Sequence, residues 1–156
     1  MIISSYGLFW DKNEVHWGHK KDSGTLAGYL EGDKNNKVDF RNQKGIYALY
    51  DSAFNLVYVG QAGSKEYQNL FLRLKNHLSD HLSERWRYFS WFGFCYVKGD
   101  NTLSDGAQHP TTSHEDALNH LEAVSIAIAE PKLNLRRGNF NCEKYFQWCE
   151  INNEKD

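Results

Sequence analysis

Two neighbouring runs of apolar residues, separated by a polar segment, are the clearest feature of the chain. Residues 45–50 and 55–60 are rich in β-forming side chains, and the segment 51–54 between them begins with turn-forming residues. This pattern predicts an antiparallel hairpin. A symmetric pairing over the turn places Tyr47 directly opposite Tyr58, and cross-strand partners share one face of a sheet. We therefore expect the two phenols to lie side by side.

Residues 1–44 show weaker strand patterns. Two short strands are predicted at 6–10 and 14–17, on either side of a polar turn. The segment is too short to be an independent domain, so we interpret it as an N-terminal extension of the same domain that covers or extends its sheet. Trp10 and Trp17 fit packing residues better than platforms for stacked bases.

An amphipathic helix is predicted over residues 67–82. Its apolar face is formed by side chains at helical spacing, namely Leu70, Phe71, Leu74 and Leu78. Arg73 and His77 follow each other at an i, i+4 step along the border of that face. Considered alone, Arg73 fits a solvated cation on the helix surface, and His77 fits a half-buried residue at the edge of the apolar face.

A second helix is predicted from Ser113 to about Glu130. Ser113 fits an N-cap, acidic residues occupy the first turn, and Pro131 stops the helix. We expect its inner face to contain Leu118, Leu121, Val124, Ser125 and Ile128. Glu122 falls at the border of that face, where a carboxylate needs a cationic partner such as Arg73, or a metal ion.

An aromatic run over residues 86–97 holds seven aromatic side chains. A run that is apolar on both faces is typical of a central strand covered from both sides, so we expect it to join the hairpin in a three-stranded sheet. A last strand or helix is expected within 138–156, ahead of a frayed tail. The predicted fold class is α+β, with a small central three-stranded antiparallel sheet flanked by helices.

Composition narrows the class of protein. The chain has 156 residues, the size of one domain with a real core. It contains no run of about eighteen apolar residues, the length that a transmembrane helix needs, and its first residues lack the pattern of a signal peptide. Three cysteines at irregular spacing suit reduced thiols better than disulfides or a zinc site. These observations predict a cytoplasmic protein without a membrane segment.

The formal net charge of −2 weighs against a broadly basic surface for nucleic acid. A local patch can serve instead of a global excess of positive charge. Basic residues occur between positions 73 and 137, at Arg73, Lys75, Arg85, Arg87, Lys132, Arg136 and Arg137. We therefore expect any contact with nucleic acid to come from this part of the chain.

Five sequence elements follow one another along the chain: Gly45-Ile46-Tyr47, Tyr58-Val59-Gly60, Arg73-x3-His77, Glu122 and Pro131-Lys132-Leu133-Asn134. Together they resemble the GIY-YIG nuclease family, with Val59 where the family usually has isoleucine. The resemblance covers residues 44–136 and implies a nuclease core at 45–137. The Arg-x3-His pairing is similar to the restriction-enzyme branch of that family.

The resemblance implies a metal-dependent endonuclease that hydrolyses phosphodiester bonds in DNA, with RNA not excluded. It assigns Tyr47 to activating or positioning the attacking water, Tyr58 to a place beside it, and Arg73 to the scissile phosphate. Glu122 would hold one Mg²⁺ or Mn²⁺ ion, and Asn134 would support the site by hydrogen bonds. The residues expected to contact nucleic acid are Gly60, Gln61, Lys132 and Arg136.

The proton acceptor is left open between Tyr47 and His77. A tyrosine with its ordinary pKa near 10 is ionised in about one molecule in a thousand at pH 7. A histidine side chain has an ordinary pKa near 6.5 and accepts a proton far more readily at that pH. The two residues are therefore joint candidates for the catalytic base, and they could act as a relay.

Other functions are compatible with the same residues. The domain could grip nucleic acid without cutting it, or residues 1–44 could bind a protein partner. The sequence carries no accompanying DNA-reading motif that would fix a cleavage preference. Either the chain cuts with little sequence preference, or its loops and N-terminal extension read a short site, or a partner protein delivers it. Cutting both strands of a duplex with one active site per chain would favour a homodimer.

Overall fold

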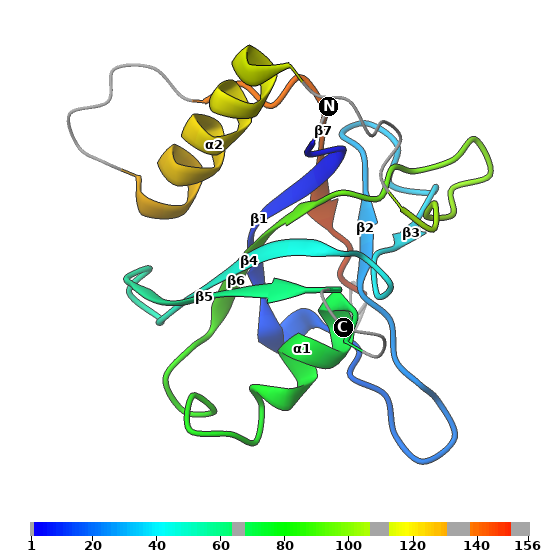
Figure 1. Cartoon of the computed structure of the whole chain (residues 1–156). Coiled ribbons are helices and arrows are strands. Elements are labelled where there is room, and N and C mark those ends of the chain that lie inside the picture. Colours follow the sequence, from blue (N-terminus) through cyan, green and yellow to red (C-terminus); the bar gives the residue numbers. More distant parts are fainter. Residues whose placement is uncertain (1, 64–67, 107–112, 131–137, 151–156) are drawn as a thin grey trace.

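A single mixed sheet organises the chain (Figure 1). The computed structural model describes residues 2–63, 68–106, 113–130 and 138–150. Seven strands lie in the order β3-β2-β7-β1-β6-β4-β5. Their bounds are β1 Ser5–Asp11, β2 Ala27–Tyr29, β3 Val38–Asp39, β4 Gly45–Tyr50, β5 Leu56–Ala62, β6 Tyr88–Gly93 and β7 Glu143–Gln147. Neighbouring strands are antiparallel except β1 and β7, which run parallel.

The predicted small three-stranded sheet flanked by helices is wrong. The three expected strands do pair, as β5, β4 and β6, but β6 also pairs with β1, and the sheet continues through β7, β2 and β3. The described residues contain only two α-helices, α1 (Leu70–Asn76) and α2 (His114–Ala129), and one 3₁₀ turn, η1 (Lys12–Glu14). A hydrophobic pattern indicates which faces of a strand are buried. It does not indicate which other strands will pair with the two hydrogen-bonding edges of that strand, so it does not predict the size of the sheet.

The N-terminal strand β1 lies in the middle of the sheet, between β7 and β6. A bulge separates Gly7 from Trp10, and Phe9 within it has a left-handed backbone with φ of 53°. The indoles of Trp91 and Trp10 fill the space where a side chain at Gly7 would lie. Ser90 holds the bulge, because its hydroxyl accepts a hydrogen bond from the Phe9 amide at 3.0 Å.

The second short strand predicted at 14–17 does not form. The chain turns into η1 instead, because the Asp11 side chain caps it by accepting a hydrogen bond from the Asn13 amide at 2.9 Å. The following loop contains only isolated bridges between single residues within the described part of the chain. Trp17 in this loop packs against Phe71 of α1, with ring centroids 5.5 Å apart.

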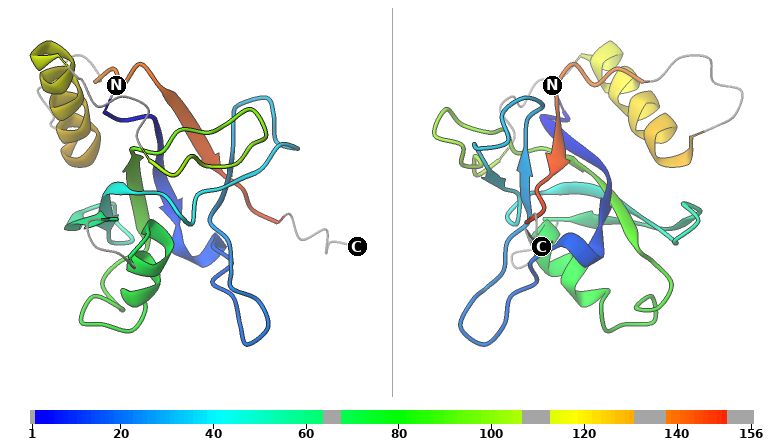
Figure 2. Two further views of the ribbon diagram at one scale, coloured as in Figure 1. Left: turned by 45° about the vertical axis from the view of Figure 1, so that its right-hand side comes forward. Right: turned by 180° about the vertical axis from the view of Figure 1, so that it is seen from behind.

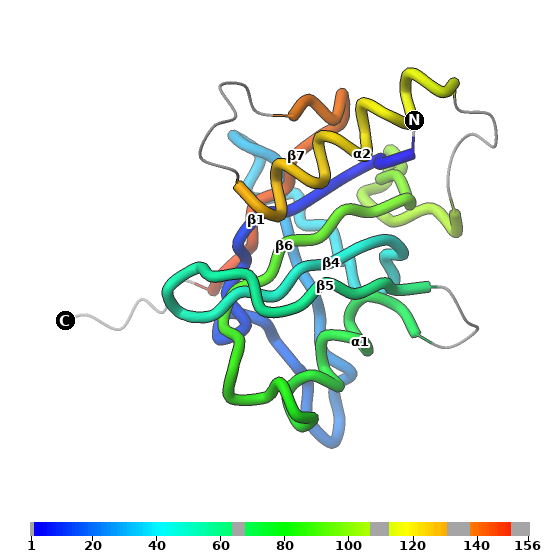
Figure 3. Tube along the Cα trace, turned by 60° about the vertical axis from the view of Figure 1, so that its left-hand side comes forward, coloured from blue at the N-terminus to red at the C-terminus, as the bar shows by residue number. Residues whose placement is uncertain are grey.

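The two helices cover opposite faces of the sheet. The larger core packs α1 against one face, and its members from β4 and β6 are Tyr47, Leu49, Phe89 and Trp91. The smaller core packs α2 against Phe92 and Ile3. Successive side chains of a strand point to opposite faces, so Trp91 and Phe92 of β6 lie on different faces of the sheet. Figures 2 and 3 show α1 and α2 on either side of the strands.

Helix α2 begins and ends close to the predicted positions. The Ser113 hydroxyl accepts a hydrogen bond from the Asp116 amide at 3.1 Å, which caps the first turn. Glu130 closes the helix in a left-handed conformation with φ of 44°. No helix within the described residues is sufficiently long and apolar to cross a membrane.

The inner face of α2 differs from the predicted one. Leu118 and Leu121 are 66% and 61% exposed, whereas the buried residues of the helix are His120, Ala123 and Val124. Apolar residues occur around more than one side of this helix, so its sequence allows more than one rotation. Its contacts with the sheet fix the rotation: the Tyr50 hydroxyl, for example, donates a hydrogen bond to the Ile128 carbonyl at 2.9 Å.

Candidate active site

The β4–β5 hairpin brings the two predicted tyrosines onto one face, in a register that differs from the expected one. Tyr47 pairs with Gly60, and Tyr58 pairs with Leu49. The prediction that Tyr47 lies directly opposite Tyr58 is therefore wrong by two residues. A two-residue shift preserves the face, because side chains alternate with a period of two. The phenol rings lie diagonally, with centroids 6.1 Å apart.

The turn and a bulge set this register. Asp51 closes the turn through its carboxylate, which accepts hydrogen bonds from the amides of Ala53 and Asn55 at 2.9 Å each. A register shift then follows in the ladder between Leu49 and Tyr50. The bulge adds a residue to one strand only, so a symmetric count across the turn misplaces every later pair.

Gly60 makes room for the Tyr47 side chain. A Cβ atom at Gly60 would lie 2.5 Å from the Tyr47 hydroxyl oxygen and 2.7 Å from a ring carbon of Tyr58. Gly45 makes room for the neighbouring strand, because a Cβ atom at Gly45 would overlap with the Phe92 carbonyl of β6. Both glycines of the paired motif are therefore required by space, one beneath the phenols and one between strands.

Helix α1 presents Arg73 and His77 toward the hairpin. The Asn69 side chain caps the helix by accepting a hydrogen bond from the Leu72 amide at 2.9 Å. The apolar side of the helix is buried in the larger core through Leu70, Phe71 and Leu74. Within the predicted span of 67–82, the α-helix itself ends at Asn76 and is followed by turns.

A chain of hydrogen bonds links Tyr47, His77 and Asp80. The Tyr47 hydroxyl lies 2.8 Å from His77 Nε2, and His77 Nδ1 lies 2.7 Å from an Asp80 carboxylate oxygen. The carboxylate only accepts, so Nδ1 carries the proton and Nε2 is free to accept from the phenol. Two further bonds hold this geometry: Trp86 Nε1 donates to the His77 carbonyl at 3.0 Å, and the Leu82 amide donates to Asp80 at 2.8 Å.

Burial and charge act in opposite directions on Tyr47. The side chain is fully buried, at 0% exposed, and this burial raises the pKa of Tyr47 to about 12. The neighbouring Arg73 guanidinium acts to lower the same pKa. A phenol with a pKa of 12 is ionised in roughly one molecule in 100,000 at pH 7. Tyr47 alone is therefore a poor base near neutral pH.

Asp80 retains its negative charge. Partial burial acts to raise the pKa of Asp80, but hydrogen bonds from the Leu82 amide and from His77 outweigh it, and the pKa lies below its ordinary value. An ionised Asp80 orients the imidazole and stabilises it when it gains a proton.

Arg73 has free hydrogen-bonding capacity beside the phenols. One terminal nitrogen, Nη1, donates to the Gln68 side-chain carbonyl at 2.8 Å. Its Nε atom is buried and has no hydrogen-bond partner among the described residues. A buried donor without a partner is costly, and an anionic oxygen would satisfy it.

The structure does not bring Glu122 to this cluster. Glu122 is exposed on α2, on the face of the sheet opposite to Tyr47 and Arg73. Gln61 is exposed on the edge strand β5, next to Gly60. The remaining predicted site residues, Asn134, Lys132 and Arg136, lie outside the described residues.

The residues beside the phenols do not fit the expected Mg²⁺ site. Mg²⁺ is bound by oxygen ligands, chiefly carboxylates and waters. The carboxylate that the described residues bring to the phenols is Asp80, and its two oxygens already accept hydrogen bonds from His77 and the Leu82 amide. Glu122 lies on the other face of the sheet. No catalytic step is therefore assigned to a metal ion at this site.

Sequence reasoning missed two residues of the cluster, Asp80 and Gln68. The signal for Asp80 was an acidic residue three positions after His77, a spacing that allows contact within a turn. Gln68 precedes the helix, and no pattern links its amide to Arg73.

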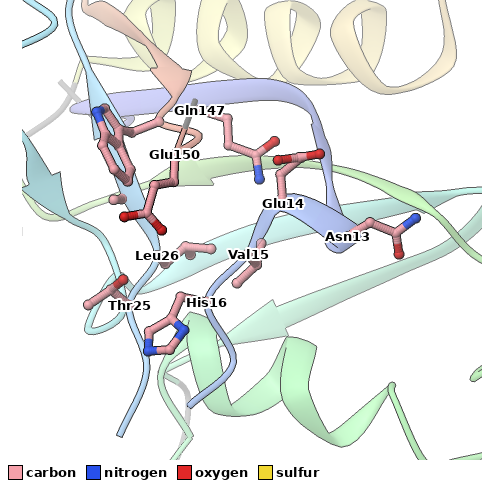
Figure 4. A pocket seen from close by; sticks show the side chains of 10 residues that line it. Asn13, Glu14, Val15, His16, Thr25, Leu26, Gln147 and Glu150 are labelled. Atoms are coloured by element: carbon pink, nitrogen blue, oxygen red, sulfur yellow. The ribbon is translucent and has the colours of Figure 1, made fainter. Parts of the chain in front are cut away.

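A pocket of about 270 Å³ lies elsewhere, between η1, β2 and the end of β7 (Figure 4). Its lining residues include the acidic side chains Glu14 and Glu150 and the imidazole of His16. None of the lining residues belongs to the tyrosine cluster.

No protein-family profile, curated protein or solved structure matches this chain. The cluster is therefore interpreted from its own geometry and from the motif resemblance.

Proposed function

We propose that this chain is a GIY-YIG-type endonuclease in which His77 accepts the proton of the attacking water through Tyr47. The observation that carries the proposal is the hydrogen-bonded series Tyr47–His77–Asp80, with Arg73 beside it. Such a series suits general base catalysis because the Asp80 carboxylate sets the tautomer of the imidazole and stabilises its charged form. A guanidinium beside the same phenol suits an anionic substrate.

The proposed reaction proceeds by one linked proton transfer. Tyr47 gives its hydroxyl proton to His77 Nε2 and takes a proton from a water molecule placed next to its oxygen. The resulting hydroxide attacks phosphorus, the bond to the leaving oxygen breaks, and that oxygen takes a proton from solvent. Arg73 neutralises the negative charge that builds up on the phosphate. Asp80 holds the protonated His77 until the proton returns to solvent.

DNA is the proposed substrate because of the motif resemblance. A cytoplasmic location is proposed with it, because three cysteines at irregular spacing suit reduced thiols. The motif resemblance also implies Mg²⁺ or Mn²⁺ as the cofactor. The described residues supply no set of ligands for such an ion beside the phenols. The cation requirement is accordingly part of the test below.

A second candidate is a module that binds nucleic acid without cutting it. Two observations favour it: the phenol of Tyr47 is fully buried, and Glu122 lies on the opposite face of the sheet. Such a module would use Arg73 to hold a phosphate and would keep Tyr47 and His77 as structural partners.

A plasmid cleavage assay with Mg²⁺ or Mn²⁺, repeated with EDTA, separates the two functions. We expect the wild-type chain to nick or cut the plasmid, and Tyr47→Phe and Arg73→Ala to lose at least about a hundredfold in rate. Lys34→Ala is the matched control, because Lys34 is exposed and lies between β2 and β3, at the edge of the sheet opposite to β4 and β5.

Electrophoretic mobility shifts on the same DNA complete the test. Binding without cleavage, under every cation condition, would overturn the nuclease proposal in favour of the binding module. Equal cleavage by the wild-type and Arg73→Ala chains would remove the cluster as the active site.

A further inference from the structure

The loop between η1 and β2 gathers two histidines and an aspartate on the surface. The ligand atoms of His16, His19 and Asp22 all lie within 4.8 Å of one another, and all three side chains are exposed. His16 Nε2 and an Asp22 carboxylate oxygen are already hydrogen bonded, and the two imidazole rings lie edge to face, with centroids 5.4 Å apart. In Figure 1 this loop extends from the sheet beside α1.

The backbone of the loop holds these side chains together. The amides and carbonyls of His19 and Asp22 exchange two hydrogen bonds of 2.9 Å, and the Thr25 amide donates to the His16 carbonyl at 2.9 Å. Gly18 and Gly24 both have left-handed backbones, with φ near 80°, where a side chain would be strained. The ligands therefore come from a short folded ribbon and not from an unstructured loop.

The loop is also anchored to the rest of the molecule. Lys75 of α1 donates a hydrogen bond to the Trp17 carbonyl at 3.0 Å. Arg41 donates from Nη1 to the Gly24 carbonyl at 3.0 Å and to the Ser23 hydroxyl at 2.7 Å. These contacts fix both sides of the ribbon against the larger core.

The orientation of Asp22 leaves one oxygen for a ligand. Its Oδ1 atom accepts a hydrogen bond from the Gly24 amide at 2.9 Å, while Oδ2 faces His16. A carboxylate held in this way resembles a metal ligand supported by an outer hydrogen bond. The exposed imidazoles need only small side-chain rotations, because ligand atoms on a tetrahedral zinc ion lie roughly 3.3–3.5 Å apart.

We propose that His16, His19 and Asp22 form a binding site for a divalent transition-metal ion such as Zn²⁺. Two imidazole nitrogens and one carboxylate oxygen suit zinc and its neighbours, whereas Mg²⁺ and Ca²⁺ prefer oxygen ligands throughout. Three protein ligands leave a position for water. The ion replaces the His16–Asp22 hydrogen bond and ties the two sides of the ribbon together. Lys20 and Lys21 at the turn repel a cation, so binding is weaker than at a closed four-ligand site.

Calorimetric titration of the purified full chain with Zn²⁺ alone tests the site. We expect one ion per chain, with affinity reduced at least about tenfold in His16→Ala, His19→Ala and Asp22→Asn. His114→Ala is the matched control, since His114 is an exposed histidine on α2. Excess Mg²⁺ should leave the Zn²⁺ affinity unchanged, because the imidazole nitrogens discriminate against it.

Asp22→Asn keeps the oxygen that accepts from the Gly24 amide, so this variant should retain the fold, as circular dichroism can verify. Zn²⁺ should raise the thermal unfolding midpoint of the wild-type chain and leave that of Asp22→Asn unchanged. Equal Zn²⁺ affinity in the wild-type and Asp22→Asn chains would overturn the proposal. So would the absence of binding heat in the wild type.

Discussion

The Tyr47 hydroxyl lies over a strand position where a side chain has no space. Gly60 is the cross-strand partner of Tyr47, and the phenol oxygen fills the volume that a Cβ atom at Gly60 would need. The same oxygen reaches His77, whose other ring nitrogen is held by Asp80. One missing methyl group thus permits a buried series of hydrogen bonds that joins the hairpin to α1.

Replacement of Gly60 by alanine should disrupt this series. The added methyl group meets the Tyr47 oxygen at 2.5 Å, so we expect a loss of about 1–3 kcal/mol in the free energy of unfolding. Gly99→Ala is the matched control, because a Cβ atom at Gly99 meets nothing within 4 Å, and its effect should stay within about 0.5 kcal/mol. Urea unfolding measures the change in the free energy of unfolding for both variants. Equal effects at the two positions would contradict the close packing over Gly60.

Replacement of Asp80 by asparagine tests whether the negative charge of Asp80 supports the proposed proton relay from Tyr47 to His77. The variant keeps an oxygen for the Leu82 amide but loses the negative charge beside His77. We expect cleavage to fall roughly 10²- to 10⁴-fold, the range for general base catalysis, with the thermal unfolding midpoint little changed. Asp105→Asn is the control, since Asp105 is exposed and distant in sequence from the cluster. Unchanged cleavage in Asp80→Asn would exclude a catalytic relay through His77.

At the scale of elements, each helix is placed by the sheet face on which it packs. Helix α1 inserts its apolar side into the larger core, which turns Arg73 and His77 toward β4 and β5. Helix α2 packs through small residues on the other face. Its most exposed leucines, Leu118 and Leu121, point away from that contact.

Substitutions on α2 can verify its rotation. Leu118→Gln and Leu121→Gln should each change the free energy of unfolding by less than about 0.5 kcal/mol, because both leucines are exposed. Val124→Ala should cost about 1–2 kcal/mol, because Val124 is buried against the smaller core. Chemical denaturation of the three variants provides the comparison. A larger cost at Leu121 than at Val124 would indicate the opposite rotation.

At the scale of the whole molecule, seven strands drawn from both ends of the chain share one sheet. Strand β1 at the start of the chain lies between β7, near its end, and β6 in its middle. The pairing of β1 with both neighbours therefore depends on residues at least 77 positions apart, the separation of Asp11 and Tyr88. Aromatic side chains contribute to the cores on both faces of the sheet, and Tyr47, Tyr50 and Tyr145 are buried.

These buried tyrosines make the fold sensitive to alkali. Burial raises the pKa values of Tyr47, Tyr50 and Tyr145 to about 12 each. Unfolded tyrosines ionise near pH 10, so the folded state binds these protons more tightly. The stability from these groups is complete below about pH 10 and is lost as the pH rises through about 12.

Urea unfolding between about pH 9 and 12 should show this loss, and tyrosinate absorbance should show a late-ionising group among the nine tyrosines. Tyr145→Phe should make the decline shallower, because one of the buried phenols is removed. A stability that stays constant across this range would contradict the burial of the three phenols.

The sequence by itself determined the local features of this protein. The hairpin strands, the face shared by Tyr47 and Tyr58, the helical step from Arg73 to His77 and the N-cap at Ser113 all follow from periodicity and short-range hydrogen bonding. Even the error of two residues in the hairpin register preserved the face, because side-chain direction depends only on whether a shift is even or odd.

Only the tertiary structure decided the size of the sheet, the rotation of α2 and the face on which Glu122 lies. The physical reason is that strand edges and helix rotations are chosen by long-range packing partners. A local pattern of apolar residues shows that a surface will be buried, but it does not show which distant surface will cover it.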